Sequence, residues 1–123
     1  MQYLAIVVGG GLGSLLRYII SQYINQTYKG FPWGTLTVNS LGSFLMGIFI
    51  VIIVEKANLS EQARLLIIVG FLGSFTTFST FSLESWQLLE QGEFGLLVIN
   101  IITNVVVGLS LFYAGTLLAR NLV

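Results

Sequence analysis

Four runs of hydrophobic residues, separated by short polar segments, cover most of this chain of 123 residues. The runs occupy residues 3–24, 33–54, 64–86 and 94–118. An α-helix needs about 20 mostly apolar residues to cross the hydrocarbon core of a bilayer, and each run is long enough to do so. The sequence therefore predicts an all-α membrane protein in which residues 1–123 form a single domain of four transmembrane helices.

The composition excludes several classes of function. Hydrophobic residues make up 55% of the chain and charged residues only 8%, against about 25% charged residues in an average soluble domain. The formal net charge is zero, so no basic surface for nucleic acid is available. Histidine, cysteine and aspartate do not occur in the sequence, which excludes zinc sites, disulfides and a Ser-His-Asp triad. With almost no acid or base to place near a reaction, the chain is not expected to be an enzyme.

Polar side chains follow one face of the second and fourth predicted helices. Thr35, Asn39 and Ser43 recur at steps of four residues, and so do Asn100 and Asn104. An amide or hydroxyl in hydrocarbon needs a partner or water, so both stripes are expected to face inward. Hydrogen bonds between helices explain any single asparagine. Two stripes together with a hydroxyl-rich third span favour a water-lined path instead.

The third span contains a segment, Thr76–Ser82, in which every residue is either a hydroxyl residue or phenylalanine. Hydroxyl side chains compete for backbone groups, and the segment follows Gly70 and Gly73, so the helix is expected to break at mid-membrane. A break frees carbonyl oxygens, which are suitable ligands for a small cation. Phe78 and Phe81 lie on one stripe, and their ring edges carry a positive potential that suits an anion.

Arg17 is the only charged residue deep inside a predicted span. A charge at the bilayer centre costs about 2.5–3.5 kcal/mol on insertion scales. Its guanidinium is therefore expected to reach the membrane interface or to bond carbonyls at another helix end, which is a structural role.

The charges flanking the spans give only a weak preference for one orientation. Four spans place both termini on one side of the membrane, together with Lys56, Arg64 and Arg120. The opposite side has Lys29 and, at greater depth, Arg17. Because the positive-inside rule depends on a clear excess of Lys and Arg on one side, this distribution permits insertion in both orientations.

Three motifs resemble the signatures of the Fluc (CrcB) family of fluoride channels. The segment GFLGSFTTFSTFSLE, residues 70–84, resembles the third-helix signature and is the most specific of the three. FPWGTLTVNSLGSFLMG, residues 31–47, resembles the second-helix signature with its Gly-Thr-Leu-x-x-Asn core intact. GGGLGSLLRY, residues 9–18, resembles the first. The resemblance covers nearly the whole chain.

The resemblance implies an antiparallel, dual-topology homodimer in the cell (inner or plasma) membrane, with two pores that let fluoride leave the cell passively and so lower its toxicity. It also implies a structural sodium ion at the dimer centre, which is not transported. The backbone carbonyls of Gly73 and Thr76 from both subunits would bind this ion. The implied partners are fluoride, a second copy of this chain and the lipid bilayer, and no nucleic acid.

The same resemblance, carried over by motif position, implies a set of fluoride pore residues. The ring residues of the pore would be Phe78 and Phe81. In many members of the family the two polar positions on the fourth helix hold tyrosine and serine, whereas both are asparagine here. The polar pore residues would be Asn39, Thr35, Ser79, Thr80, Asn100 and Asn104.

Two alternatives come from other classes of membrane protein. A small multidrug exporter also has four helices and often dual topology, but it needs a membrane-embedded carboxylate for proton coupling. A structural membrane subunit with asparagines between its helices would leave the phenylalanine and hydroxyl motif unexplained. The glutamates do not favour the exporter, because all five are predicted at span ends or in loops: Glu55, Glu61, Glu84, Glu90 and Glu93.

Overall fold

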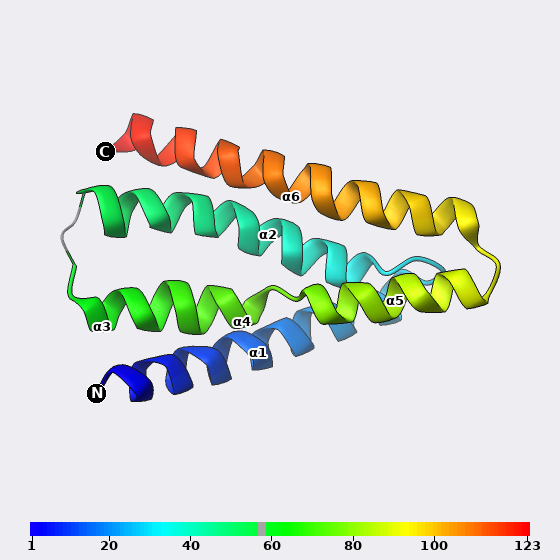
Figure 1. Ribbon diagram of the computed structural model, residues 1–123, viewed down its shortest axis with the longest axis horizontal. Helices are drawn as coiled ribbons and strands as arrows, with labels where there is room; N and C mark the ends of the chain where they lie inside the picture. Colours follow the sequence, from blue (N-terminus) through cyan, green and yellow to red (C-terminus); the bar gives the residue numbers. More distant parts are fainter. Residues whose placement is uncertain (57–58) are drawn as a thin grey trace.

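The computed structural model describes residues 1–56 and 59–123. Residues 57 and 58, which the sequence places in the loop after the second span, lie outside the described part. The described residues form four helical segments, each long and apolar enough to cross a membrane, and contain no strand. The predicted all-α architecture is therefore confirmed. Figure 1 shows the segments side by side, with both termini at the same end of the bundle.

Each helical segment extends beyond the bounds predicted from hydropathy. The hydrophobic pattern marks only the apolar part of a helix, whereas the backbone hydrogen bonds continue into the polar residues at its ends. The segments, in chain order, are α1 (Gln2–Thr27); α2 (Trp33–Ile50) continued by the π-helical η1 (Val51–Lys56); α3 (Glu61–Arg64), η2 (Leu65–Leu72), α4 (Gly73–Phe75) and α5 (Phe78–Glu90); and α6 (Phe94–Leu122).

Two short loops contain the glycines that have a left-handed backbone. Gly30, between α1 and α2, has a φ of 92°, and Gly92, between α5 and α6, has a φ of 74°. Glycine adopts this region without the steric cost that a Cβ atom imposes. These turns reverse the chain so that consecutive helices pack against each other.

Close packing between the helices depends on small residues. A Cβ atom at Gly9 would meet the backbone carbonyl of Leu66, and one at Gly13 would meet that of Phe71. The backbone of α1 therefore lies directly against η2, because two glycines four residues apart leave one face of the helix open to close approach. The same spacing leaves Gly11 on the outer side of α1, where a Cβ atom would meet nothing within 4 Å.

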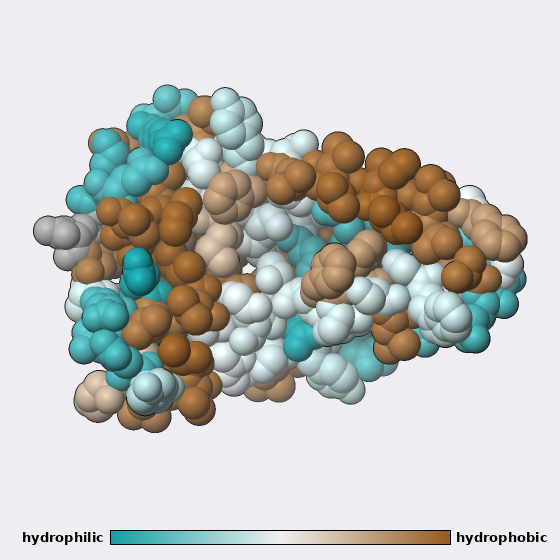
Figure 2. Space-filling model, viewed as in Figure 1, coloured by the Kyte–Doolittle hydropathy of each residue, from teal (hydrophilic) through white to brown (hydrophobic). Residues whose placement is uncertain are grey.

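The two ends of the bundle are more polar than the surface of α6 between them (Figure 2). Figure 2 shows hydrophilic residues at both ends of the molecule and hydrophobic residues along α6 between them. At the end that holds the termini, the Nη2 atom of Arg120 lies 2.8 Å from Oε1 of Glu55 and joins α6 to η1. Both side chains are exposed, so this ion pair contributes little to stability. The distribution matches a protein whose middle faces lipid and whose ends face water.

Candidate functional site

The third helical segment is interrupted between α4 and α5 (Figure 1). Thr76 (φ −88°, ψ 158°) and Thr77 (φ −150°, ψ 123°) have extended backbones. Helix α5 begins again with Thr77 as its N-cap, because the Thr77 hydroxyl accepts a hydrogen bond of 3.1 Å from the backbone N–H of Thr80. The interruption leaves the N–H and C=O groups of Thr77 without helical partners, and each requires a partner from elsewhere.

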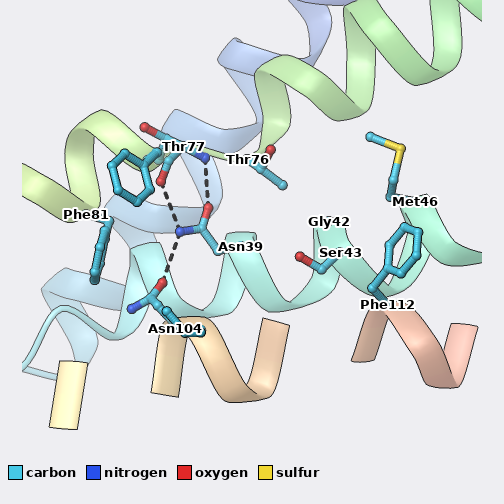
Figure 3. Close-up of a pocket in the computed structure, with 11 residues that line it drawn as sticks. Asn39, Gly42, Ser43, Met46, Thr76, Thr77, Phe81, Asn104 and Phe112 are labelled. Atoms are coloured by element: carbon cyan, nitrogen blue, oxygen red, sulfur yellow. Dashed lines mark hydrogen bonds between the residues drawn. The ribbon is translucent and has the colours of Figure 1, made fainter. Parts of the chain in front are cut away.

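Asn39 on α2 satisfies both of these backbone groups (Figure 3). The N–H of Thr77 donates to Oδ1 of Asn39 at 2.8 Å, and Nδ2 of Asn39 donates to the carbonyl oxygen of Thr77 at 3.0 Å. The same Nδ2 also donates to Oδ1 of Asn104 on α6 at 3.0 Å. A single amide thus joins the interruption in the third segment to two other helices.

The hydrogen-bonded chain continues along α6 and back to α5. Nδ2 of Asn104 donates to the backbone carbonyl of Asn100 at 2.9 Å and to its Oδ1 at 3.0 Å. Nδ2 of Asn100 donates to Oγ of Ser85 at 3.0 Å, and that hydroxyl donates to the carbonyl of Phe81 at 2.7 Å. Asn100 is fully buried. Ser85 was not among the predicted site residues, and its only sequence signal was its position one turn after Phe81.

A cavity of about 290 Å³ lies beside this network. Predicted residues from three segments meet there. The rings of Phe78 and Phe81 have centroids 5.4 Å apart and are inclined at 52°. Phe81 is 8% exposed, whereas Phe78 is 78% exposed, so the cavity is open on the side of Phe78. The predicted residues that line the cavity are Asn39, Thr76, Phe78, Phe81 and Asn104.

A second cavity has a volume of about 260 Å³, and Thr77 lines both cavities. Two further predicted residues, Thr35 and Thr80, line this second cavity. The hydroxyl of Thr35 is buried and donates to Oε1 of Glu84 at 2.8 Å. Arg17 also lines the cavity; its Nε atom and Oε2 of Glu84 are buried without hydrogen-bond partners among the described residues.

The placement of Glu84 corrects the sequence analysis. The hydrophobic pattern predicted it at the end of a span, but it lies inside α5, well before the helix ends at Glu90. Hydropathy places the end of the span at residue 86 because Glu84, Ser85 and Gln87 make its last turn polar, although the helix continues to Glu90. The missed signal is that Glu84 follows Thr80 by four residues, which places both side chains on one face of α5.

The remaining predicted residues lie around the interruption. Ser79 is exposed, and its Oγ is 3.3 Å from Oγ1 of Thr77. Gly73 begins α4, and Thr76 follows its last residue. The Gly73 carbonyl therefore belongs to the last turn before the break, where a helix leaves its carbonyls without intrahelical partners, and the Thr76 carbonyl belongs to the first extended residue of the break.

Comparison with known proteins identifies the family. Residues 4–116 match the family described as CrcB-like protein, Camphor Resistance (CrcB). The chain belongs to the CrcB family. The resemblance read from its three motifs is thus confirmed. The match also favours this family over the small multidrug exporters, although one carboxylate, that of Glu84, does lie within a membrane-capable helix. As a CrcB family member with four such helices, the chain is a multi-pass membrane protein.

Relatives of this CrcB chain are similar along nearly their whole length. A protein named fluoride-specific ion channel FluC from Saccharophagus degradans is 47% identical over 121 residues, which cover 98% of this chain and 91% of the relative. Proteins of the same name from Pyrococcus horikoshii (45% identical, 94% of both chains) and Legionella pneumophila strain Lens (44% identical, 96% and 89%) are also similar. All three names describe ion channels, and none describes an enzyme.

Proposed function

We propose that this chain is a fluoride-specific ion channel that lets fluoride leave the cell passively and so lowers its toxicity. The observation that supports this most is the cavity in which Asn39, the interrupted segment at Thr77 and the rings of Phe78 and Phe81 lie together. Fluoride is small and strongly hydrated, so a path for it must replace water with hydrogen-bond donors. The amide and hydroxyl groups are such donors, and the ring edges add positive potential without the deep trap that a fixed charge would form.

The proposed assembly is an antiparallel homodimer in the cell membrane. Phe78 lines the cavity yet is 78% exposed in a single chain, so a second copy seated on that side would complete the wall of the pore. The weak charge bias across the four spans permits copies of both orientations. Two copies related by a twofold axis would then form two equivalent pores.

A structural sodium ion at the centre of this dimer is part of the proposal. The residues fit such an ion, because the Gly73 carbonyl lies in the last turn before the break, the Thr76 carbonyl lies at its first extended residue, and both are neutral oxygen ligands. The described residues contain no group of three or more acidic, histidine or cysteine side chains that would favour a divalent metal instead. Two carbonyls from each of two subunits would surround the ion, which would join the subunits and would not travel with fluoride.

Fluoride release from liposomes tests the proposed function. Purified protein in liposomes loaded with potassium fluoride is expected to release fluoride, read by a fluoride electrode, once a potassium ionophore balances the charge. Chloride-loaded liposomes are expected to release almost nothing under the same conditions. Equal rates for the two halides would contradict fluoride specificity, and release that requires a proton gradient would support the exporter alternative.

Removing sodium tests the structural ion. When sodium on both sides of the membrane is replaced by a large organic cation, fluoride release is expected to fall, because the carbonyls at Gly73 and Thr76 lose the ion that joins them. Tracer sodium is expected not to cross during fluoride release in the sodium-containing control. Unchanged release after exhaustive replacement would contradict a structural role for sodium.

A further inference from the structure

Both protons of the Asn39 amide are already donated within the chain. Its Oδ1 accepts from the N–H of Thr77, and the two protons of its Nδ2 go to the carbonyl of Thr77 and to Oδ1 of Asn104. An asparagine amide has only two N–H protons. In this conformation Asn39 therefore has no free proton with which to bind an anion, although it lines the cavity.

Backbone groups determine the direction of each bond around Asn39. The N–H of Thr77 can only donate and its carbonyl can only accept, so Asn39 must turn Oδ1 to the first and Nδ2 to the second. The carbonyl of Asn100 can only accept, so Asn104 must turn its Nδ2 to that carbonyl. The Oδ1 atom of Asn104 is then the group that faces Asn39.

The hydrogen bonds at the Asn100 end of the network are also fixed in direction. The Ser85 hydroxyl donates its one proton to the carbonyl of Phe81, so it accepts from Nδ2 of Asn100. Oδ1 of Asn100 is therefore free to accept from Asn104. The buried Asn100 thus holds the Asn104 amide with its oxygen directed at Asn39. One arrangement of protons satisfies the whole network.

We infer that Asn104 is a positioning residue whose amide oxygen occupies the Asn39 donor until an anion displaces it. The inference rests on the proposed function. Of the two bonds that Nδ2 of Asn39 donates, the one to Thr77 is part of a two-bond pair with a backbone peptide, whereas the one to Asn104 is a single bond between side chains. The bond to Asn104 is therefore the one that an anion replaces.

This competition weakens the binding of every anion at Asn39 by the same factor. Hydrogen bonds to an ionised acceptor are roughly twice as strong as those between neutral groups, so an anion close to Asn39 can displace an amide oxygen. The attraction falls as the distance to the centre of the charge grows, so a large halide such as chloride gains less than fluoride. Breaking the bond to the Asn104 oxygen costs the same free energy for either anion, so Asn104 lowers the affinity for both, and the preference for fluoride comes from its stronger bond to the Asn39 proton.

Replacing Asn104 by alanine tests the inference. In Asn104→Ala the Asn39 proton faces the cavity without a competitor. Fluoride release, measured at a fluoride concentration well below saturation, is therefore expected to rise about fivefold. This factor corresponds to about 1 kcal/mol, at 1.4 kcal/mol per factor of ten. Chloride release is expected to rise by the same factor, because both anions displace the same amide oxygen. Asn104→Ser, whose hydroxyl is shorter, is expected to change both rates in the same direction. Ser110→Ala, an exposed position on the same helix, is the matched control and should leave both rates unchanged.

The double variant Asn39→Ser with Asn104→Ala separates competition from a general loosening of the bundle. If Asn104 acts through the Asn39 proton, the rise seen in Asn104→Ala disappears when Asn39 is replaced. A rise that persists in the double variant, or an unchanged or reduced fluoride rate in both Asn104 variants with normal gel-filtration profiles, overturns the inference. A wild-type protein that releases no fluoride would overturn the proposed function itself, which is a distinguishable result.

Discussion

Asn39→Asp is expected to reduce fluoride release at neutral pH by at least about 100-fold, which corresponds to two factors of ten at 1.4 kcal/mol each. The ionised carboxylate cannot donate a hydrogen bond and adds a negative charge to the cavity. It can still accept from the N–H of Thr77, but it faces the carbonyl of Thr77 and Oδ1 of Asn104 without a proton to offer either. Like charges placed together cost several kcal/mol, so an anion would be excluded.

Electrode-monitored release from liposomes measures this effect, with Asn39→Ser as the milder companion. Serine retains one hydroxyl donor, so that variant is expected to keep part of the activity. Gel filtration of both variants checks that the assembly has the wild-type size. If the aspartate variant releases fluoride at the wild-type rate, Asn39 does not lie on the path and the proposed pore is wrong.

Phe78→Ile and Phe81→Ile are each expected to slow fluoride release at least about tenfold, or 1.4 kcal/mol. Isoleucine fills much of the space of the ring but has no positive edge to direct at an anion. The two rings lie 5.4 Å apart at the same cavity, so each contributes to the same stretch of the path.

The matched control for the ring variants is Phe94→Ile. Phe94 is an exposed phenylalanine at the start of α6 and does not line the cavity. Its replacement is expected to leave the release rate unchanged. Near-normal rates in both pore variants would mean that Phe78 and Phe81 serve packing only.

Much of the fold could be predicted because its causes are local in the sequence. A run of apolar residues long enough to cross a bilayer forms a helix wherever it occurs, since its backbone groups have no other partners in hydrocarbon. The hydroxyl residues from Thr76 onward indicated where the third segment leaves the helix, because they offer the backbone an alternative partner. The extended backbone at Thr76 and Thr77 lies within that segment.

The sequence alone determined the four membrane-capable helices and the polar stripes that include Asn39 and Asn104. Only the tertiary structure decided which groups on those stripes meet. That Thr35 bonds Glu84, and that the oxygen of Asn104 occupies the proton of Asn39, depends on how α2, α5 and α6 are rotated about their axes. Helix rotation results from packing between segments far apart in the chain, and a hydrogen bond forms only when two atoms come within about 3 Å of each other. Periodicity along one helix contains no information on either.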